Sequence, residues 1–292
     1  MDILIRVLIY GLINSIILAL MAVGFSLVYG ISRLPNFAHG ALYITAGFAA
    51  WALHNALDLP YAVSIVLSLI ITAAIGAAIY QLVLIRVRGM PISEIIASYA
   101  IGLAMLEGFR WAGFRGMTYT LPAFVSGTVD IAGVAVDYQR LVVVGIGTAL
   151  VLSLWLFTHY TKLGLSLRAI AQDERAALML GIDSDRTALI ALALGSALTG
   201  LAAVTILPLG NITVKTGYDV LIFALAVCVV GGLGSWVGSI VAAFVIGFAQ
   251  ILTVAFFKPH FQMVVALAAI IIVLIARPSG LFGRQKELEE RV

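Results

Sequence analysis

Charged residues are scarce in this chain. Lys, Arg, Asp and Glu make up only 11% of its 292 residues, whereas 63% are hydrophobic and the mean hydropathy is +1.14. Soluble domains carry about 25% charged residues, and a soluble fold of this length could not bury so much apolar surface. The apolar segments are continuous and do not alternate with polar residues, which excludes a transmembrane β-barrel. The composition therefore predicts an all-α fold, a polytopic transmembrane helical bundle.

Cysteine and recognisable catalytic patterns are equally sparse. The single cysteine, Cys228, lies in an apolar run and excludes an internal disulfide. Three histidines, His54, His159 and His260, lie at the ends of apolar runs without the spacing of a metal site. No Ser/His/Asp, HExxH or paired-carboxylate arrangement is present. We therefore expect no enzyme activity, no catalytic residue, no metal and no cofactor.

The sequence also lacks a nucleotide-binding loop. The glycine-rich string VVGGLGSWVG at residues 229–238 is not followed by Gly-Lys-Ser/Thr, so it is not a P-loop, and energy from ATP would have to come from another subunit. A proton-coupled carrier would ordinarily place a carboxylate deep in the bundle. Glu94, Glu107 and Asp219 instead lie toward the ends of apolar runs. A stand-alone secondary carrier is therefore disfavoured but stays an alternative, as does a passive channel.

The charge-free windows divide the chain into candidate membrane spans, each near the 20 or so apolar residues that cross a bilayer. They are residues 5–29, 38–54, 61–84, 92–111, 141–159, 187–207, 220–230, 237–256 and 261–276. Breaks at residues 36–40 and 231–235 are either loops or re-entrant segments, so the expected count is about eight or nine. Residues 7–32 are uncharged and too long for a signal peptide core, so we expect them to remain as the first span.

The distribution of Lys and Arg predicts the orientation, because cytoplasmic loops carry an excess of both. With nine spans, one side receives Arg33, Arg86, Arg88, Lys162, Arg168, Arg175, Arg186, Arg277, Arg284, Lys286 and Arg291. The other side receives Arg6, Arg110, Arg115, Arg140, Lys215 and Lys258. This excess places residues 162–186 and the C-terminus in the cytoplasm, and the N-terminus outside.

The longest outside segment, residues 114–139, contains the string VDIAGVAVDY, which predicts a short β-hairpin split by Gly133. This loop either contacts an extracytoplasmic partner or folds over the protein's own helices. Both interpretations stay open at this point.

Residues 162–186 form a charged interlude between two long uncharged runs. Apolar residues recur there with rough helical spacing, and Gly181 is a typical glycine helix stop. Such a helix at the membrane face suits docking of a water-soluble partner, and Ala176 and Ala177 would let that partner pack closely. Amphipathicity alone fits equally well with a helix resting on lipid headgroups.

Four strings resemble the permease subunits of ABC importers for branched-chain amino acids, in the order in which that family carries them. They are LVYGISRLPNFAHGALYITAGF (27–48), GLSLRAIAQDERAALMLGI (164–182), VVGGLGSWVGSIVAAFVIG (229–247) and ARPSGLFGR (276–284). The resemblance implies the ABC importer permease fold, with all of residues 1–292 as a single transmembrane permease domain in the cell inner membrane. It also implies cytoplasmic ATP-binding subunits, a second permease subunit, related or identical, and an extracytoplasmic substrate-binding protein.

By resemblance, the residues expected to couple the permease to the ATPase are Gly164, Arg168, Ala169, Asp173, Ala176, Ala177 and Gly181. Those expected to line or gate the translocation path are Asn36, His39, Gly231, Gly232, Gly234 and Ser235. Plainer interpretations exist for both groups of path residues: Asn36 as a helix cap, and the glycines as small-residue packing positions between helices. Branched-chain or related amino acids are the implied substrates, and a urea or amide importer permease of the same family is the alternative.

Overall fold

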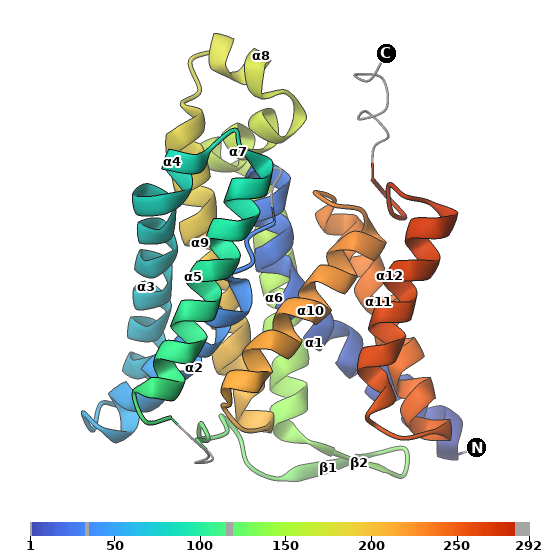
Figure 1. The fold of residues 1–292 in the computed structure, drawn as a ribbon. Coiled ribbons are helices and arrows are strands. Elements are labelled where there is room, and N and C mark those ends of the chain that lie inside the picture. Colours follow the sequence, from blue (N-terminus) through green and yellow to red (C-terminus); the bar gives the residue numbers. More distant parts are fainter. Residues whose placement is uncertain (1, 33–34, 115–118, 284–292) are drawn as a thin grey trace.

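The computed structural model describes residues 2–32, 35–114 and 119–283. Residues 115–118 of the expected outside loop, and Arg33, Arg115, Arg284, Lys286 and Arg291 of the orientation argument, lie outside the described residues. The described chain is almost entirely helical, and the membrane-spanning α-helical bundle predicted from composition is confirmed (Figure 1).

Nine helices of 16 residues or more occur in the described chain, one at each predicted span. They are α1 (Asp2–Ser32), α2 (His39–Asn55), α3 (Tyr61–Ile79), α5 (Pro91–Trp111), α6 (Tyr138–Tyr160), α9 (Ser184–Ile206), α10 (Val214–Gly231), α11 (Trp236–Phe256) and α12 (Phe261–Ala276). Seven are long and apolar enough to cross a bilayer. One of these seven spans consists of α3 together with the two short helical elements that follow it, and it ends at Val87. Of the other two, α12 is a shorter apolar helix and α2 has 17 residues.

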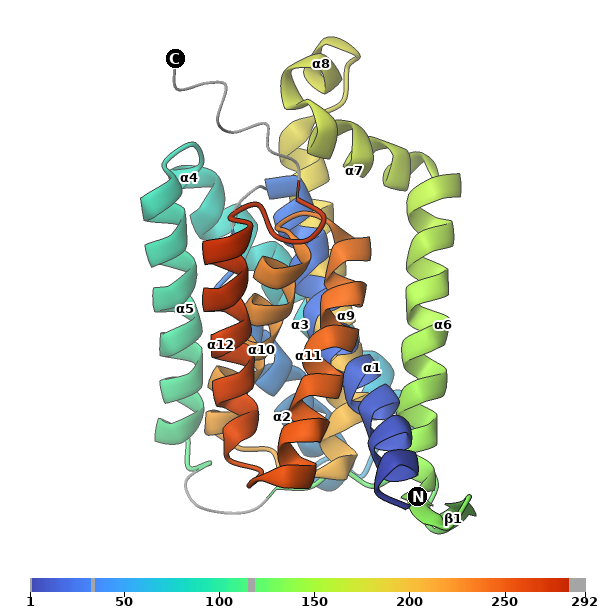
Figure 2. The ribbon, with the colours of Figure 1, turned by 90° about the vertical axis from the view of Figure 1, so that its right-hand side faces the viewer.

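Short elements connect these helices. They are the π-helix η1 (Tyr80–Leu84), α4 (Ile85–Val87), β1 (Thr128–Ile131), β2 (Val134–Asp137), α7 (Lys162–Gln172), α8 (Glu174–Met179) and the 3₁₀ turn η2 (Leu207–Leu209). Elements α4, α7 and α8 lie at one end of the bundle, with the last turn of α12, and we call this end the α7–α8 face (Figures 1 and 2). The start of α1 and the two strands lie at the opposite end, the hairpin face.

Helix α2 is the centre of the bundle. It packs against α3, α9 and α10, and every residue from His39 to Phe48 is buried. Its small residues allow this close packing, because a Cβ added at Gly40 would come within 2.0 Å of the Gly217 carbonyl oxygen of α10. A helix enclosed in this way does not need the length or the lipid-facing surface of an ordinary span.

The first predicted break is a non-helical segment inside the bundle. Residues 35–38 run beside the middle of α5, where Ser98 Oγ accepts a hydrogen bond of 3.2 Å from the Phe37 backbone N–H. A Cβ added at Gly102 would lie 3.0 Å from Ala38 Cα, so only glycine leaves room for this backbone. Non-helical backbone at membrane depth is tolerated where protein surrounds it, and this segment satisfies that condition.

The second predicted break is a turn at the α7–α8 face. Gly232 and Gly234 have φ values of +102° and +83°, which favour glycine, and Ser235 Oγ caps α11 by accepting from the Gly238 N–H. The backbone of Leu281 and Phe282 donates hydrogen bonds to the carbonyls of Val230 and Gly231. The glycine string therefore joins α10 to α11 and holds the segment that follows α12.

The predicted β-hairpin is confirmed. β1 and β2 pair antiparallel, with Ile131 opposite Val134, and the turn residues Ala132 and Gly133 both have positive φ. Val134 and Val136 are buried against α1, whereas the alternate side chains are exposed. One side of the hairpin thus folds over the protein's own helices, and the other faces outward.

Candidate functional sites

The charged interlude forms two helices joined at Asp173, so the single helix expected from the sequence is wrong. The Asp173 backbone is extended, and its side chain caps α8 by accepting from the Ala176 N–H at 3.1 Å. A short polar side chain that bonds to nearby backbone competes with helix continuation, which explains the break. Viewed from the side, α7 runs across the end of the bundle from α6, and α8 stands farthest out (Figure 2).

Helix α8 ends in a Schellman motif. The Ile182 N–H bonds to the Ala177 carbonyl at 3.1 Å, and the Gly181 N–H bonds to the Leu178 carbonyl at 3.0 Å. Gly181 supplies the required positive φ of +82°. The predicted helix stop at Gly181 is confirmed.

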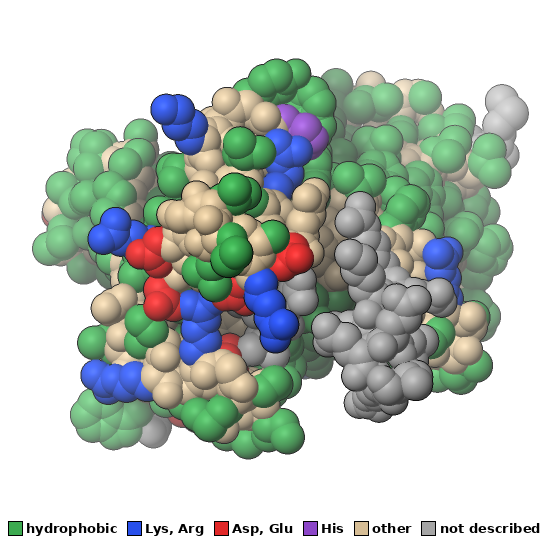
Figure 3. All heavy atoms as spheres, turned by 90° about the horizontal axis from the view of Figure 1, so that it is seen from above, with side chains coloured by type: hydrophobic (Ala, Val, Ile, Leu, Met, Phe, Trp, Pro, Cys, Tyr) green, Lys and Arg blue, Asp and Glu red, His purple; other side chains and the backbone are tan. Residues whose placement is uncertain are grey.

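The outer end of α8 exposes three large apolar side chains in succession. Leu178, Met179 and Leu180 are 51%, 89% and 80% exposed, and we call them the apolar tip. Exposed Lys, Arg, Asp and Glu side chains gather on the same face (Figure 3). An apolar patch with a charged rim, projecting from the end of the bundle, is typical of a protein-docking surface.

Ala177 lies on the opposite side of α8 from this surface. It is 2% exposed and packs in a small core with Ile31, Leu167, Ile170 and Ala191. Ala177 therefore cannot offer a close-packing surface to a partner, whereas Ala176 is exposed and its packing role stays a prediction.

The other expected coupling residues shape the segment. A Cβ added at Gly164 would lie 2.2 Å from the Phe157 carbonyl oxygen, so glycine lets α7 turn tightly away from α6. Ala169 packs partly buried against the core around Ala177. Arg168 is half-buried, and its Nε atom is enclosed without a hydrogen-bond partner. Of the seven residues, Asp173 and Ala176 are thus the side chains that lie exposed on α8 or at its start.

His39 and Asn36 occupy different surroundings. The His39 ring is buried and bridges three helices: Nε2 donates to the Met21 carbonyl of α1 at 2.8 Å, and Nδ1 lies 3.2 Å from Thr199 Oγ1 of α9. Asn36 Oδ1 accepts from the Ala38 N–H at 3.0 Å, a local turn that precedes α2. Ala38 is the N-cap residue of α2 and receives no side-chain cap, so Asn36 does not cap this helix as the plainer interpretation expects. The His39 contacts hold α2 to α1 and α9.

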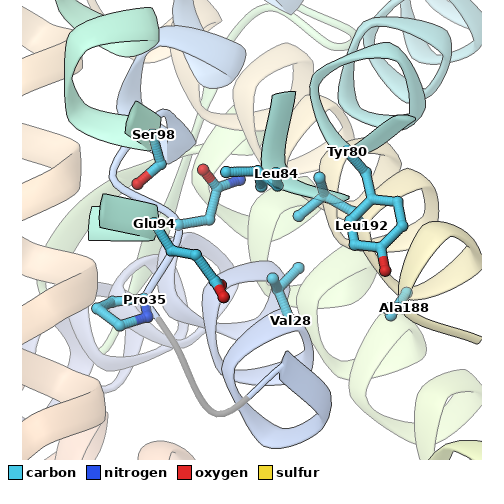
Figure 4. A pocket seen from close by; sticks show the side chains of 10 residues that line it. Val28, Pro35, Tyr80, Leu84, Glu94, Ser98, Ala188 and Leu192 are labelled. Carbon is cyan, nitrogen blue, oxygen red and sulfur yellow. The ribbon is translucent and has the colours of Figure 1, made fainter. Parts of the chain in front are cut away.

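Asn36 also lines a small cavity of about 30 Å³ together with Ser98, Glu94 and Tyr80 (Figure 4). Such a volume has room for about one or two water molecules and not for an amino acid. The cavity shares Tyr80, Glu94 and other residues with a larger polar cleft of about 720 Å³ at the α7–α8 face. Neither space is lined by His39 or by the glycines of the α10–α11 turn.

Sequence reasoning did not identify the polar groups that surround the larger cleft. Arg88 lines it and forms ion pairs with Glu174 of α8 and Asp185 of α9. Their separation along the chain is 86 and 97 residues, so no local pattern links them. The sequence offered one signal for this cluster, namely that Arg88 is a charged residue in a mostly apolar chain.

Among the described residues, no three His, Cys, Asp or Glu side chains are grouped to hold a metal ion. What the described chain does present is a multi-pass helical bundle with a short two-helix segment, α7 and α8, and a cleft at one end. Such a bundle belongs to the class of multi-pass membrane proteins.

Comparison with known proteins gives the family. Residues 7–274 match the model of the family described as branched-chain amino acid transport system / permease component, and the chain belongs to this family. It is 30% identical to the high-affinity branched-chain amino acid transport system permease protein BraD of Pseudomonas aeruginosa, covering 95% of each chain. It is 29% identical to the corresponding permease protein LivH of Escherichia coli K12, covering 91% of each.

A solved structure shares the fold. PsaBC from Streptococcus pneumoniae, in complex with Fab, superposes with a TM-score of 0.57 at 15% identity, covering 98% of this chain and 95% of that one. The resemblance to permeases of this family that the four strings indicated is confirmed, and so is the ABC permease fold.

Proposed function

We propose that this protein is the membrane-spanning subunit of an ATP-driven importer of branched-chain or related amino acids. Membership of the permease family and the substrates named for the relatives BraD and LivH support the substrate class. The apolar tip of α8 is the observation that supports the use of ATP by a separate subunit. It gives a separate ATP-binding subunit a surface on which to dock.

In this proposal residues 162–186 are the cytoplasmic coupling segment. Asp173 and Ala176 contribute to its surface, while Gly164, Arg168, Ala169, Ala177 and Gly181 hold its shape. The α7–α8 face and the C-terminus then lie in the cytoplasm, and the N-terminus lies outside the inner membrane. The outward side of the hairpin, within residues 114–139, faces an extracytoplasmic substrate-binding protein.

The translocation path would form between this chain and a second permease subunit, identical or related. ATP-driven closure of the ATPases would shift the pair between outward-open and inward-open states, and each ligand shifts this equilibrium only by its different affinity for the two states. Asn36 sits at a break in the helices where such a shift would alter the backbone. His39 and the Gly231, Gly232, Gly234 and Ser235 turn would support the gating helices and not contact the substrate.

The first experiment is purification of the tagged protein from its native membrane in mild detergent, followed by uptake assays in proteoliposomes. Recovery of P-loop ATPase subunits and ATP-dependent uptake of leucine, isoleucine or valine would support the proposal. ATP-dependent uptake of urea or an amide alone would change the substrate class. Uptake by this chain alone without ATP would make it a secondary carrier or channel and overturn the proposal.

A point substitution tests the docking surface directly. Met179→Asp places a charge in the middle of the apolar tip, where 89% exposure means that the fold should tolerate it. We expect the variant to insert normally but to lose the ATPase subunits during purification. Leu165→Asp, 60% exposed near the other end of the segment, is the matched control and should retain them. Equal retention by both variants would contradict docking at the tip.

A further inference from the structure

We infer that Arg88 is a positioning residue for α8, which fixes this docking helix to the wall formed by α3 and α5 and transmits its movement to that wall. The inference rests on the proposed function of α8. It assigns the transmission of movement to a residue outside the coupling segment.

One guanidinium group joins four elements. Arg88 directly follows α4, and its Nη2 donates to Glu174 Oε1 of α8 at 2.5 Å and to Ser184 Oγ at the start of α9. Its Nη1 donates to Asp185 Oδ1 of α9 and lies 3.5 Å from the Tyr80 hydroxyl of η1. The planar, multivalent fork of arginine is suited to such a junction, whereas a lysine ammonium would lack its geometry.

The partners of Arg88 also bond to one another. Ser184 Oγ donates to Glu174 Oε1 at 2.6 Å, and the Tyr80 hydroxyl donates to Asp185 Oδ1 at 3.1 Å. The Arg88 side chain is only 33% exposed, so it is more shielded from water than the Arg186 side chain of the same face, which is 85% exposed and pairs with Asp183. We call Arg88, Glu174, Ser184, Asp185 and Tyr80 the Arg88 junction.

The Arg88 junction forms part of the lining of the larger cleft. All five of its residues line this cleft. Helix α8 otherwise packs mainly on its chain neighbours α7 and α9, so the ion pair to Glu174 is its cross-link to the α4–α5 turn. An outward or sideways displacement of α8 must either break this ion pair or pull the turn with it.

A continuous set of contacts leads inward from this turn. The Gly89 N–H, next to Arg88, donates to Glu94 Oε1 in the first turn of α5 at 2.9 Å. One turn farther along α5, Ser98 accepts from the Phe37 N–H in the buried break between α1 and α2. On the other side of the Arg88 junction, Tyr80 begins the π-helix η1 that follows α3, an irregularity of the kind frequently found at functional sites. The Arg88 junction thus lies between the docking helix and the two irregular segments of the bundle.

The decisive measurement uses the complete importer, with its ATPase and binding-protein subunits, in proteoliposomes. The quantity measured is the number of substrate molecules imported per ATP hydrolysed. Arg88→Gln should lower this ratio roughly fivefold or more, in the usual range of coupling between sites, while ATP hydrolysis continues. An unchanged ratio would overturn the inference.

Two variants control for a general loss of charge. Arg86→Gln removes a guanidinium from α4 on the same face, but Arg86 is exposed and forms no ion pair among the described residues, so the ratio should stay at the unmutated value. Glu174→Gln should reproduce the Arg88→Gln effect, and the double variant should be no worse than either single variant because both remove one linkage. Additive losses would contradict a shared linkage.

A structural readout separates this inference from the proposed function. In a Cys228→Ala background, spin labels at Met90 and Met179, which are 50% and 89% exposed, report the distance between the α4–α5 turn and α8. We expect one narrow distance distribution, broadened by Arg88→Gln and not by Arg86→Gln. If Arg88→Gln broadens the distance distribution but the protein shows no ATP-dependent uptake, only the proposed function is overturned. If Arg88→Gln leaves the distribution narrow, the positioning role of Arg88 is overturned.

Discussion

Ala177→Trp and Met179→Trp place the same large side chain on opposite sides of α8, two residues apart. Ala177 is 2% exposed in the small core beneath the coupling segment, whereas Met179 is 89% exposed at the apolar tip. Overpacking a filled core costs about 1–3 kcal/mol, and a tryptophan adds far more volume than one methylene. An exposed substitution usually stays within about 0.5 kcal/mol. The two variants should therefore fail in different ways.

The measurement is limited trypsin cleavage after the exposed Arg175, in detergent and without partners. When local opening is fast, the cleavage rate follows the population of the open segment. A cost of about 1–3 kcal/mol multiplies that population roughly 5- to 150-fold, so Ala177→Trp should be cleaved faster by such a factor. Met179→Trp should be cleaved at the unmutated rate and should fail only in binding the ATPase. Cleavage of Ala177→Trp at the unmutated rate would refute the inward placement of Ala177.

Three further predictions concern the packing of the bundle and the end of α8. Gly102→Ala should be less stable to heating in detergent than Gly108→Ala, because the new methyl group meets the Ala38 backbone at 3.0 Å in the first case and nothing within 4 Å in the second; equal melting temperatures would contradict this packing. His39→Ala should destabilise the protein by about 1–3 kcal/mol through loss of its buried hydrogen bond to the Met21 carbonyl, seen as a lower melting temperature that adding substrate does not restore. Gly181→Ala should cost about 1–2 kcal/mol at a φ of +82°, raising trypsin cleavage after Arg175; an unchanged rate would argue against the Schellman end of α8.

The sequence was most informative about features that depend on local pattern. Charge-free windows gave nine candidate spans and an expected count of about eight or nine, and a helix of 16 residues or more lies at each window of the described chain. Gly133 predicted the hairpin and Gly181 the end of α8, because both positions need a positive φ. Local chemistry is enough for such features.

Features that depend on distant contacts were not predictable. The six residues of α8 are too few for helical periodicity to show which side is buried, and this is why Ala176 and Ala177 seemed equivalent in the sequence. The partners of Arg88 lie in elements whose proximity only the fold determines. The depth of the break at residues 35–38 likewise depends on its packing against Ser98 and Gly102 of α5.

The enclosure of α2 has a consequence for how the protein is made. During synthesis α2 enters the membrane long before α9 and α10, two of the helices that surround it. Until they arrive, His39 has its Met21 partner on α1 but not its Thr199 partner on α9, and the small residues of α2 that face these two helices have nothing to pack against. Assembly of the centre is therefore delayed until the C-terminal half is in place. Chains interrupted after α6 should be recognised as incomplete and degraded.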